Sequence, residues 1–381
     1  MILVSIIGGL GGVFLAMALA GAVFGVFATF ASSRFLRGKP APPAELPAVT
    51  LLRPMKGLDP EADQNLHSLC DQDYAGPVRI ILGADSAEDP AFAPAGRLKA
   101  AWPDRDIVLV ADATPHGTNR KLGNLINMSA QARGEIIVIS DSDVRLPRQG
   151  LSALVGALQQ PGVGLAYGLY RGRPAGNLWS RLAALDINAR FASSVVVGQV
   201  VGAHPVLGPT MAVRAEALAA AGGFERLKDV LADDFELGRM VREQGLSIAC
   251  PPMLIDHVFP ERTLKEVWMH ELRWARTIRL LNPGGYVGSV ITYVLPLALI
   301  GAALAGLAPW SLTVLAALTA LRLVQCLVLC RLMQADRGVI WLFPLRDLLS
   351  FAVFLAAFLG DRIEWRGNRL RVKADGVMAS T

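Results

Sequence analysis

Two long stretches of the chain contain no charged residue. Residues 1–33 and 280–321 are both uncharged, and each is long enough to cross a hydrocarbon core of about 30 Å. The first stretch predicts an N-terminal transmembrane anchor over residues 1–33. The second has about twice the length of one span. A glycine-to-proline break near 306–309 divides it into predicted spans at 286–306 and 310–333.

A third apolar segment, residues 338–360, is interrupted by Arg346 and Asp347. It either crosses the membrane once or forms two short pieces that dip in and out, and we favour this re-entrant form. A single crossing would put the basic tail 361–381 on the outer side, against the positive-inside rule. We group residues 283–360 as the C-terminal membrane segments.

Basic residues follow the predicted anchor directly. Arg34, Arg37 and Lys39 come just after it, so the positive-inside rule places the following domain in the cytoplasm. Residues 34–47 are rich in proline and predict a stiff linker. We expect a globular domain over residues 48–260.

Within this domain, short aliphatic runs alternate with segments of helix-forming composition. The runs are rich in β-branched residues, which favours buried strands. Their spacing requires crossover connections, so the pattern predicts an α/β fold with a mostly parallel sheet. The four clearest runs are Val49–Leu52, Val78–Leu82, Ile107–Val110 and Ile136–Ile139.

Residues 262–281 have the periodicity of an amphipathic helix. Glu271 and Arg279 are the only charges on its apolar half, and we expect an interfacial helix over 261–282 beside the membrane. Its polar half directs Arg273 either to a diphosphate or to lipid headgroups, and the periodicity favours neither. The apolar half carries Leu264, Val267, Trp268, Leu272, Trp274, Ala275, Ile278 and Leu281.

The composition agrees with a membrane-anchored domain. The chain is 53% hydrophobic and 18% charged, and its mean hydropathy is +0.42, which is unusual for an ordinary cytosolic protein. The 37 basic and 32 acidic residues leave a formal charge of +5. No basic run interleaved with aromatic residues accompanies this excess, so we expect no nucleic-acid partner. The excess suits an anionic lipid surface.

Acidic residues follow two of the predicted strands. Asp85 comes after the second strand, and Asp141 and Asp143 come after the fourth. Ligands of open α/β sheets bind beyond the carboxyl ends of the strands. Two carboxylates one residue apart suit a divalent cation that is also held by substrate phosphates. The alternative is that Asp-Ser-Asp only opens a turn.

A second acidic pair, Asp233 and Asp234, precedes a helix-like segment. Acidic residues stabilise helix N-termini, which is the simpler interpretation. The functional interpretation is a general base that takes a proton from an acceptor hydroxyl. His257 follows 23 residues after Asp234; it could be a further ligand, although a packed histidine is the more common case.

Taken in order, these motifs resemble the ceramide glucosyltransferase-like family, glycosyltransferase family 21. Its members are inverting nucleotide-sugar transferases with the GT-A fold, and the likeness covers nearly the whole chain. Bacterial members include ceramide glycosyltransferases and a hopanoid-associated branch, which the intact Asp-Ser-Asp motif slightly favours. The motifs are Leu52-Arg-Pro-Met-Lys-Gly57, Gly83-Ala-Asp85, Asn119-Arg-Lys121-Leu-Gly-Asn124-Leu, Asp141-Ser-Asp143, Asp233-Asp234 and His270-Glu-Leu-Arg273-Trp274.

The resemblance implies roles for five acidic and basic residues. Asp85 is expected to bind the uridine of a UDP-sugar donor, and Lys121 to contact the donor as well. Asp141 and Asp143 are expected to hold Mg²⁺ or Mn²⁺ together with the diphosphate. Asp234, the second acid of its pair, is expected to be the catalytic base.

The resemblance also implies catalytic roles on the amphipathic segment. Arg273 and Trp274 match the end of the family's (Gln/Arg)-x-x-Arg-Trp element. His270 stands at its first position, where the family has Gln or Arg, and we expect it to contact the donor.

We therefore predict an inverting transfer of glucose or N-acetylglucosamine from a UDP-sugar to a lipid hydroxyl. The acceptor would be a hopanoid polyol such as bacteriohopanetetrol, or ceramide, at the cytoplasmic face of a bacterial inner membrane. A processive polysaccharide synthase is the nearest alternative, but three or four spans are too few for a polymer channel. A membrane-tethered dinucleotide oxidoreductase is disfavoured because no Gly-x-Gly-x-x-Gly follows the first predicted strand. Too few intramembrane charges are present for a transporter pathway.

Overall fold

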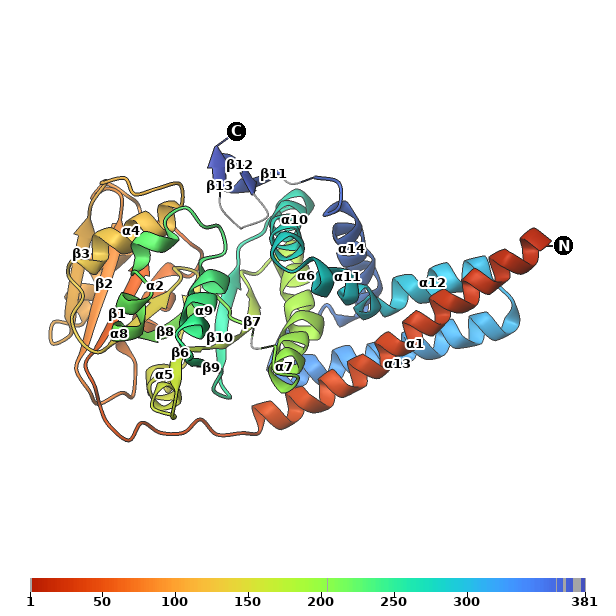
Figure 1. Cartoon of the computed structure of the whole chain (residues 1–381), viewed down its shortest axis with the longest axis horizontal. Coiled ribbons are helices and arrows are strands. Elements are labelled where there is room, and N and C mark those ends of the chain that lie inside the picture. The colour runs from red at the N-terminus through yellow and green to blue at the C-terminus, as the bar shows by residue number, and fades with distance from the viewer. Residues whose placement is uncertain (1, 204, 361, 366–367, 373–377, 381) are drawn as a thin grey trace. The chain divides into compact units, whose positions relative to one another are not determined.

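The chain divides into two compact units (Figure 1). The computed structural model describes residues 2–203, 205–360, 362–365, 368–372 and 378–380. The sheet unit comprises Leu36–Ala175, Val201–Pro260 and Gly376–Thr381, and the helical unit comprises Met1–Phe35, Gly176–Val200 and Glu261–Asp375.

A mixed, mostly parallel sheet forms the centre of the sheet unit. β1 is parallel to β2 and to β4, and β2 is parallel to β3. β8 runs antiparallel to both β4 and β6, and β9 is parallel to β6. Among the described residues the sheet has seven strands, in the order β3 (Asp106–Ala111), β2 (Val78–Ala84), β1 (Val49–Pro54), β4 (Ile136–Ser140), β8 (Thr210–Arg214), β6 (Val163–Tyr167) and β9 (Ser247–Ala249).

The four predicted strands are β1 to β4, and the predicted α/β fold is confirmed. Every residue of β1 and β4 is buried, which explains why both appear in the sequence as continuous aliphatic runs. The antiparallel pairing of β8 with β4 and with β6 was not predicted, because it joins segments that lie far apart in the sequence.

A second, smaller sheet lies next to the carboxyl end of β4. β10 (Leu254–Phe259) pairs antiparallel with β5 (Val144–Arg145) and parallel with β7 (Leu169–Pro174). In this register His257 lies opposite Val144, the residue after Asp143. The small sheet therefore fixes the backbone that follows the Asp-Ser-Asp motif.

Helix α4 approaches β2 closely because β2 carries a glycine. A Cβ on Gly83 would lie 2.5 Å from the Met128 side chain, and Asn124 Nδ2 donates a hydrogen bond to the Gly83 carbonyl at 2.8 Å. The helices of the sheet unit are α2 (Ala62–Cys70), α3 (Phe92–Ala101), α4 (Arg120–Ser129), α5 (Gly150–Leu158), α8 (Ala215–Ala220), the 3₁₀ helix η2 (Phe224–Leu227) and α9 (Asp233–Glu243).

The helical unit contains membrane-spanning helices. By length and hydropathy, Gly8–Leu36 of α1 (Ile2–Leu36) and all of α13 (Pro309–Leu332) can each cross a membrane. The predicted span 286–306 is a pair bent by 68°, made of Pro283–Thr292 and α12 (Val294–Leu304). The described residues thus contain two spanning helices, or three spans if the bent pair is taken as a single span. The chain is a membrane protein.

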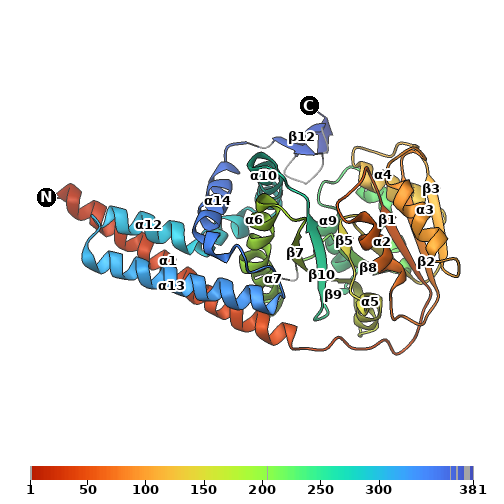
Figure 2. The same cartoon turned by 180° about the vertical axis from the view of Figure 1, so that it is seen from behind.

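Helices α1, α12 and α13 lie side by side (Figures 1 and 2). Leu15 and Ala18 of α1 share a buried cluster with Ala298 of α12 and Leu318 of α13. A Cβ on Gly21 would lie 1.8 Å from the Ile291 carbonyl oxygen. Small residues allow such close contacts between helices in membranes.

Residues Gly176–Val200, which we placed inside a continuous 48–260 domain, cluster with the helical unit. Leu185 and Ala189 from this segment are buried against Leu295, Cys326 and Phe343. The remaining elements of the unit are α6 (Leu178–Asp186), the π-helix η1 (Ile187–Phe191), α7 (Ala192–Val200), α10 (Leu264–Leu281), α11 (Pro283–Gly288), the 3₁₀ helices η3 (Ser289–Thr292) and η4 (Ile340–Leu342), and α14 (Phe343–Ala356).

The charges that interrupt the third apolar segment are buried and paired. Arg346 Nη2 lies 2.7 Å from Glu271 of α10, and Asp347 lies 2.9 Å from Arg322 of α13. Pairing explains how α14 tolerates charge in an apolar segment. With 14 residues, α14 is shorter than a typical spanning helix. The re-entrant form of 338–360 stays a prediction.

The predicted amphipathic helix is α10. Leu272 is buried in a cluster with Phe354, and Trp268 and Ala275 pack against the same cluster. Much of the apolar half is therefore covered by protein rather than left for lipid, whereas Leu264 and Ile278 remain exposed. The two charged exceptions on this half also have structural partners, since Glu271 pairs with Arg346 and Arg279 donates to the Gly360 carbonyl.

The predicted basic tail, 361–381, forms strands where the structure describes it. β11 (Arg362–Trp365) pairs antiparallel with β12 (Asn368–Val372), and β13 (Met378–Ser380) follows. The rest of the predicted tail, including Arg366 and Lys373, lies outside the described residues.

Candidate active site

A lysine bridges two carboxylates in the sheet unit. Lys121 Nζ lies 2.8 Å from Asp141 Oδ1 and 3.0 Å from Asp233 Oδ2. Lys121 belongs to the first turn of α4, Asp141 follows β4, and Asp233 begins α9. The structure thus brings together three residues that span more than a hundred positions of the sequence. Burial lowers the pKa of Lys121, but the charges of the two aspartates outweigh it, and the net shift is upward.

Asn119 fixes this arrangement. Its side-chain oxygen accepts hydrogen bonds from the Lys121 and Leu122 amides, which caps α4. Its Nδ2 donates to the Val230 carbonyl at 2.7 Å, and its amide donates to the Lys228 carbonyl. One residue therefore joins the start of α4 to the loop that precedes α9.

The Asp-Ser-Asp motif is held by both sheets. The Asp141 amide donates to the Pro209 carbonyl, next to β8. Asp143 Oδ2 lies 3.2 Å from His257 Nε2, and the Asp143 carbonyl accepts from the Val258 amide. His257 is buried against aromatic rings of the small sheet. It is a packed histidine that also contacts one of the predicted metal ligands.

Asp234 lies in a different environment from Asp233. Its Oδ1 accepts from the Phe235 amide at 2.8 Å, and its other oxygen faces Gly208, where a Cβ would lie 3.2 Å away. Burial and the charge of Asp233 raise the pKa of Asp234 to about 6. A carboxylate with such a pKa can accept a proton near neutral pH.

The site carries an excess of negative charge. The charges of Asp143 and Asp233 act on Asp141, and those of Asp233 and Asp141 act on Asp234. Lys121 bridges Asp141 and Asp233. Burial raises the pKa of Asp141, and the Lys121 charge opposes that rise. Such an excess favours a bound cation.

The donor set fits a hard divalent cation with few protein ligands. Asp141 and Asp143 supply carboxylates one residue apart. Within the described part of the chain, no group of three or more His, Cys, Asp or Glu residues is arranged to hold a metal. Mg²⁺ and similar ions are often held by one or two carboxylates plus substrate phosphates and waters. The residues therefore fit an ion that arrives with a phosphorylated donor.

Asp85 lies between two cations at the end of β2. Its Oδ2 accepts from Arg120 Nη2 at 2.6 Å and from Lys56 Nζ at 3.2 Å. Sequence reasoning gave no role to either cation, although both lie inside the motifs that carry the resemblance. Their exposure leaves them accessible to a ligand.

Arg53 is a further residue whose role sequence reasoning missed. It is fully buried and donates to Ser140 Oγ at 2.8 Å and to the Val144 carbonyl at 3.0 Å. Burial lowers its pKa to about 10, against the opposing charges of Asp143 and Asp141. The guanidinium thus holds the backbone on both sides of the Asp-Ser-Asp motif.

The remaining predicted site residues lie on α10, in the helical unit. His270 Nδ1 is paired with Glu261 Oε1, and its ring packs edge-on against Trp274, with centroids 4.2 Å apart. The Arg273 carbonyl accepts from Thr277 one turn later. That these three residues act with the carboxylates of the sheet unit stays a prediction.

Comparison with known proteins identifies the family. The profile described as Glycosyl transferase family 21 matches residues 13–378, which is nearly the whole chain. The chain belongs to glycosyl transferase family 21. This confirms the family that the ordered motifs predicted.

Curated relatives of this family 21 chain are glycosyltransferases by name. A ceramide glucosyltransferase from Komagataella phaffii is 35% identical over 132 residues, covering 33% of the chain and 26% of the relative. An N-acetylglucosaminyltransferase from Bradyrhizobium elkanii is 30% identical over 125 residues, covering 32% of the chain and 66% of the relative. The chain thus spans between about a quarter and two thirds of the length of these two curated relatives.

A solved structure shares the fold of the family 21 chain. The mannosyltransferase PcManGT from Pyrobaculum calidifontis, solved in complex with GDP-Man and Mn2+, is 20% identical, with a TM-score of 0.52. The match covers 91% of this chain and 99% of that one. This likeness supports the GT-A fold.

Proposed function

We propose that this family 21 chain transfers a sugar from a UDP-sugar to a lipid hydroxyl, with inversion at the anomeric carbon. The observation that carries the proposal is the carboxylate of Asp234, whose raised pKa suits a general base and which adjoins the Lys121–Asp141–Asp233 cluster. The names of the relatives favour glucose or N-acetylglucosamine as the sugar.

The reaction is a single displacement. Asp234 takes the proton of the acceptor hydroxyl, and that oxygen forms a bond to the anomeric carbon of the sugar. The bond from this carbon to the diphosphate breaks, and UDP leaves with the electron pair. Attack from the face opposite to UDP inverts the configuration.

Residues of the sheet unit hold the donor. Asp85 binds the uridine, and Lys56 and Arg120 orient its carboxylate. Asp141 and Asp143 would hold Mg²⁺ or Mn²⁺. Such an ion, when bound, offsets the negative charge of the diphosphate. Lys121 supplies a positive charge between Asp141 and Asp233.

The α10 residues complete the proposed site. Arg273 stabilises charge on the leaving diphosphate, because a guanidinium can donate two parallel hydrogen bonds to it. Trp274 lies against His270, which is held by buried Glu261. In place of the family's Gln or Arg, His270 would contact the donor only while this pairing keeps its ring in position.

The acceptor is a membrane lipid, a hopanoid polyol or ceramide. Drawing an acyl or polycyclic body out of the bilayer costs about 0.8 kcal/mol per CH₂ group, so the reaction has to take place at the membrane. The spans in the helical unit provide that location. We place the sheet unit at the cytoplasmic face of a bacterial inner membrane, because Arg34, Arg37 and Lys39 follow the anchor.

The test is a product survey with purified full-length protein. It is incubated in separate reactions with radiolabelled UDP-glucose and UDP-N-acetylglucosamine, each with a total lipid extract, and labelled products are separated and identified. We expect label in one glycolipid with wild-type protein and almost none with Asp234→Asn. Label in a polymer would instead support a polysaccharide synthase, and label only in free sugar would contradict the proposed acceptor.

A further inference from the structure

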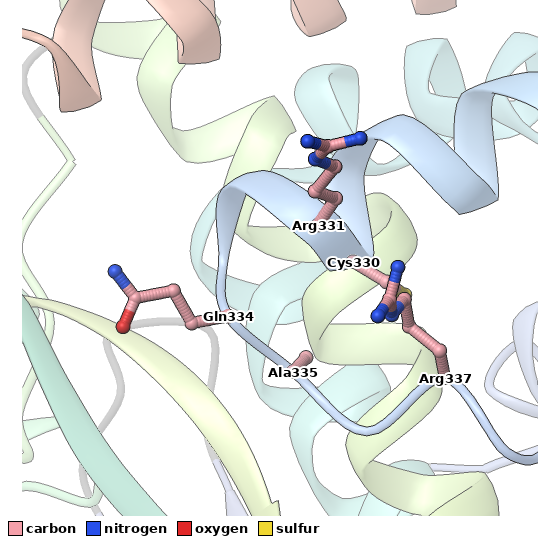
Figure 3. A pocket seen from close by; sticks show the side chains of 5 residues that line it. All are labelled: Cys330, Arg331, Gln334, Ala335 and Arg337. Atoms are coloured by element: carbon pink, nitrogen blue, oxygen red, sulfur yellow. The ribbon is translucent and has the colours of Figure 1, made fainter.

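An open pocket lies at the end of the spanning helix α13. It has a volume of about 450 Å³ and is lined by Cys330, Arg331, Gln334, Ala335 and Arg337. Figure 3 shows the Arg331 side chain leaving the last turn of α13 and the Arg337 side chain rising from the following loop. Gln334 points away from both. The pocket is therefore lined by two arginines that come from either side of one chain reversal.

These two arginines have no acidic partner among the described residues. Both are exposed, and neither forms an ion pair within 4.0 Å there. The nearest carboxylate in sequence, Asp336, is paired with Arg181 of α6 and accepts from the Gly338 amide. The acid between the two arginines is thus already engaged elsewhere, and their guanidinium groups remain available to an anion.

A span from Trp310 to Arg331 would place the pocket at the depth of lipid headgroups. At about 1.5 Å per residue, α13 rises about 32 Å from Trp310 to Arg331, which matches the thickness of a hydrocarbon core. Trp310 at one end and Trp341, shortly after the other end, are both exposed. Tryptophan is enriched at the two interfaces of a membrane.

The pocket is on the same side of the membrane as the basic end of α1. Leu318 of α13 packs with Leu15 of α1, and further along both helices Gln325 Nε2 donates to the Ala22 carbonyl at 3.2 Å. The two helices therefore run parallel. Arg34, in the last turn of α1, and Arg331, in the last turn of α13, face the same leaflet.

We propose that Arg331 and Arg337 bind the phosphate of an anionic phospholipid headgroup in this pocket. Guanidinium groups donate paired hydrogen bonds to phosphate oxygens, and basic pockets at the ends of spanning helices suit anionic headgroups. The lipid is distinct from the sugar acceptor, which needs a hydroxyl and no negative charge. The proposal rests on the membrane assignment and not on the proposed sugar transfer.

The test counts lipids retained by the full-length protein. The protein is equilibrated in mixed micelles of phosphatidylglycerol and phosphatidylcholine, and native mass spectrometry measures each bound lipid. We expect one phosphatidylglycerol per chain, and a roughly 30-fold loss of its affinity in Arg331→Gln/Arg337→Gln, since each cation near an anionic surface contributes about fivefold. Arg34→Gln/Arg37→Gln, which removes two cations that lie at the basic end of α1 and outside the pocket, should lose about fivefold or less.

Two further arms separate the possible explanations. Arg331→Lys/Arg337→Lys keeps the charge and the exposed surface, so it should retain more affinity than the glutamine pair and unfold at the wild-type temperature. Inorganic phosphate at millimolar concentration should not displace the lipid, because it lacks the acyl chains. Equal losses in Arg34→Gln/Arg37→Gln and in Arg331→Gln/Arg337→Gln, or displacement by inorganic phosphate, would overturn the proposal.

Discussion

The two adjacent aspartates at the start of α9 differ in their partners. Asp233 Oδ2 lies 3.0 Å from Lys121 Nζ, whereas Asp234 accepts a backbone hydrogen bond from the Phe235 amide. Burial and the neighbouring charge of Asp233 raise the pKa of Asp234 to about 6. We therefore assign the proton transfer to Asp234 and the positioning of Lys121 to Asp233.

Asp234→Asn should lower kcat by about 10²- to 10⁴-fold and leave the affinity for the UDP-sugar nearly unchanged, because the base acts on the acceptor. In the wild type, kcat should fall as the pH drops through about 6, since only the ionised carboxylate accepts a proton. Steady-state kinetics from pH 5 to pH 8 measure both effects. If Asp233→Asn lowered kcat far more than Asp234→Asn, the roles of the two aspartates would be reversed.

The charge excess around Lys121 predicts a metal requirement. Asp141 and Asp143 by themselves would repel the donor diphosphate, so activity should vanish in EDTA and return with Mg²⁺ or Mn²⁺. The measurement is transfer activity after chelation and re-addition of each ion. Full activity in excess chelator would transfer the charge-neutralising role to Lys121 and Arg273.

At the scale of elements, Asn119 couples two helices. It caps α4 and also donates to the Val230 carbonyl, in the loop before α9. Asn282 caps α11 in the helical unit, where its side-chain oxygen accepts from the Gly285 amide at 3.0 Å. These two residues form a matched pair in which only Asn119 adjoins the proposed catalytic cluster.

Asn119→Ala and Asn282→Ala should each destabilise the protein by about 0.5–2 kcal/mol, because each removes an N-cap. Only Asn119→Ala should also lower transfer activity, since it loosens Lys121 relative to Asp233. Thermal unfolding in detergent and kcat/KM at a temperature where both variants are folded give the comparison. Equal activity of the two variants would show that the Asn119 link does not position the cluster.

The buried pair between α10 and α14 makes a second prediction at this scale. Glu271→Gln leaves Arg346, which is 2% exposed, without its closest carboxylate, and loss of one partner of a buried pair typically costs about 3–5 kcal/mol. Replacing both, as Glu271→Leu with Arg346→Met, should recover most of the stability. Thermal unfolding of the three proteins measures this. A double variant as unstable as Glu271→Gln would mean that these two charges also stabilise the protein through contacts with other residues.

Sequence patterns predicted the elements whose burial is continuous along the chain. The runs that became β1 to β4 begin at or within one residue of the observed strands. β1 and β4 are buried throughout, and strands buried on both faces need unbroken aliphatic sequence. Patterns could not predict the contacts between distant residues. The Lys121–Asp233 pair and the Arg346–Glu271 pair each depend on tertiary structure, and Glu271 therefore appeared as an unexplained charge on an apolar face.

At the scale of the whole molecule, each unit is assembled from separate pieces of the chain. Residues Gly176–Val200 lie in sequence between two pieces of the sheet unit, but they pack with the helices of the helical unit. Composition did not reveal this excursion, because α6, η1 and α7 carry ordinary polar residues such as Arg181 and Asn188. The family assignment, by contrast, followed from the order of short motifs, which does not require knowledge of the packing.

The central claim is that the chain transfers a sugar directly from a UDP-sugar to a lipid hydroxyl. The most direct measurement is the anomeric configuration of the purified glycolipid product, determined by proton NMR. The sugar is α-linked in UDP-glucose and in UDP-N-acetylglucosamine, so a single displacement assisted by Asp234 predicts a β-linked lipid. An α-linked product would contradict the displacement and the role of Asp234 as its base.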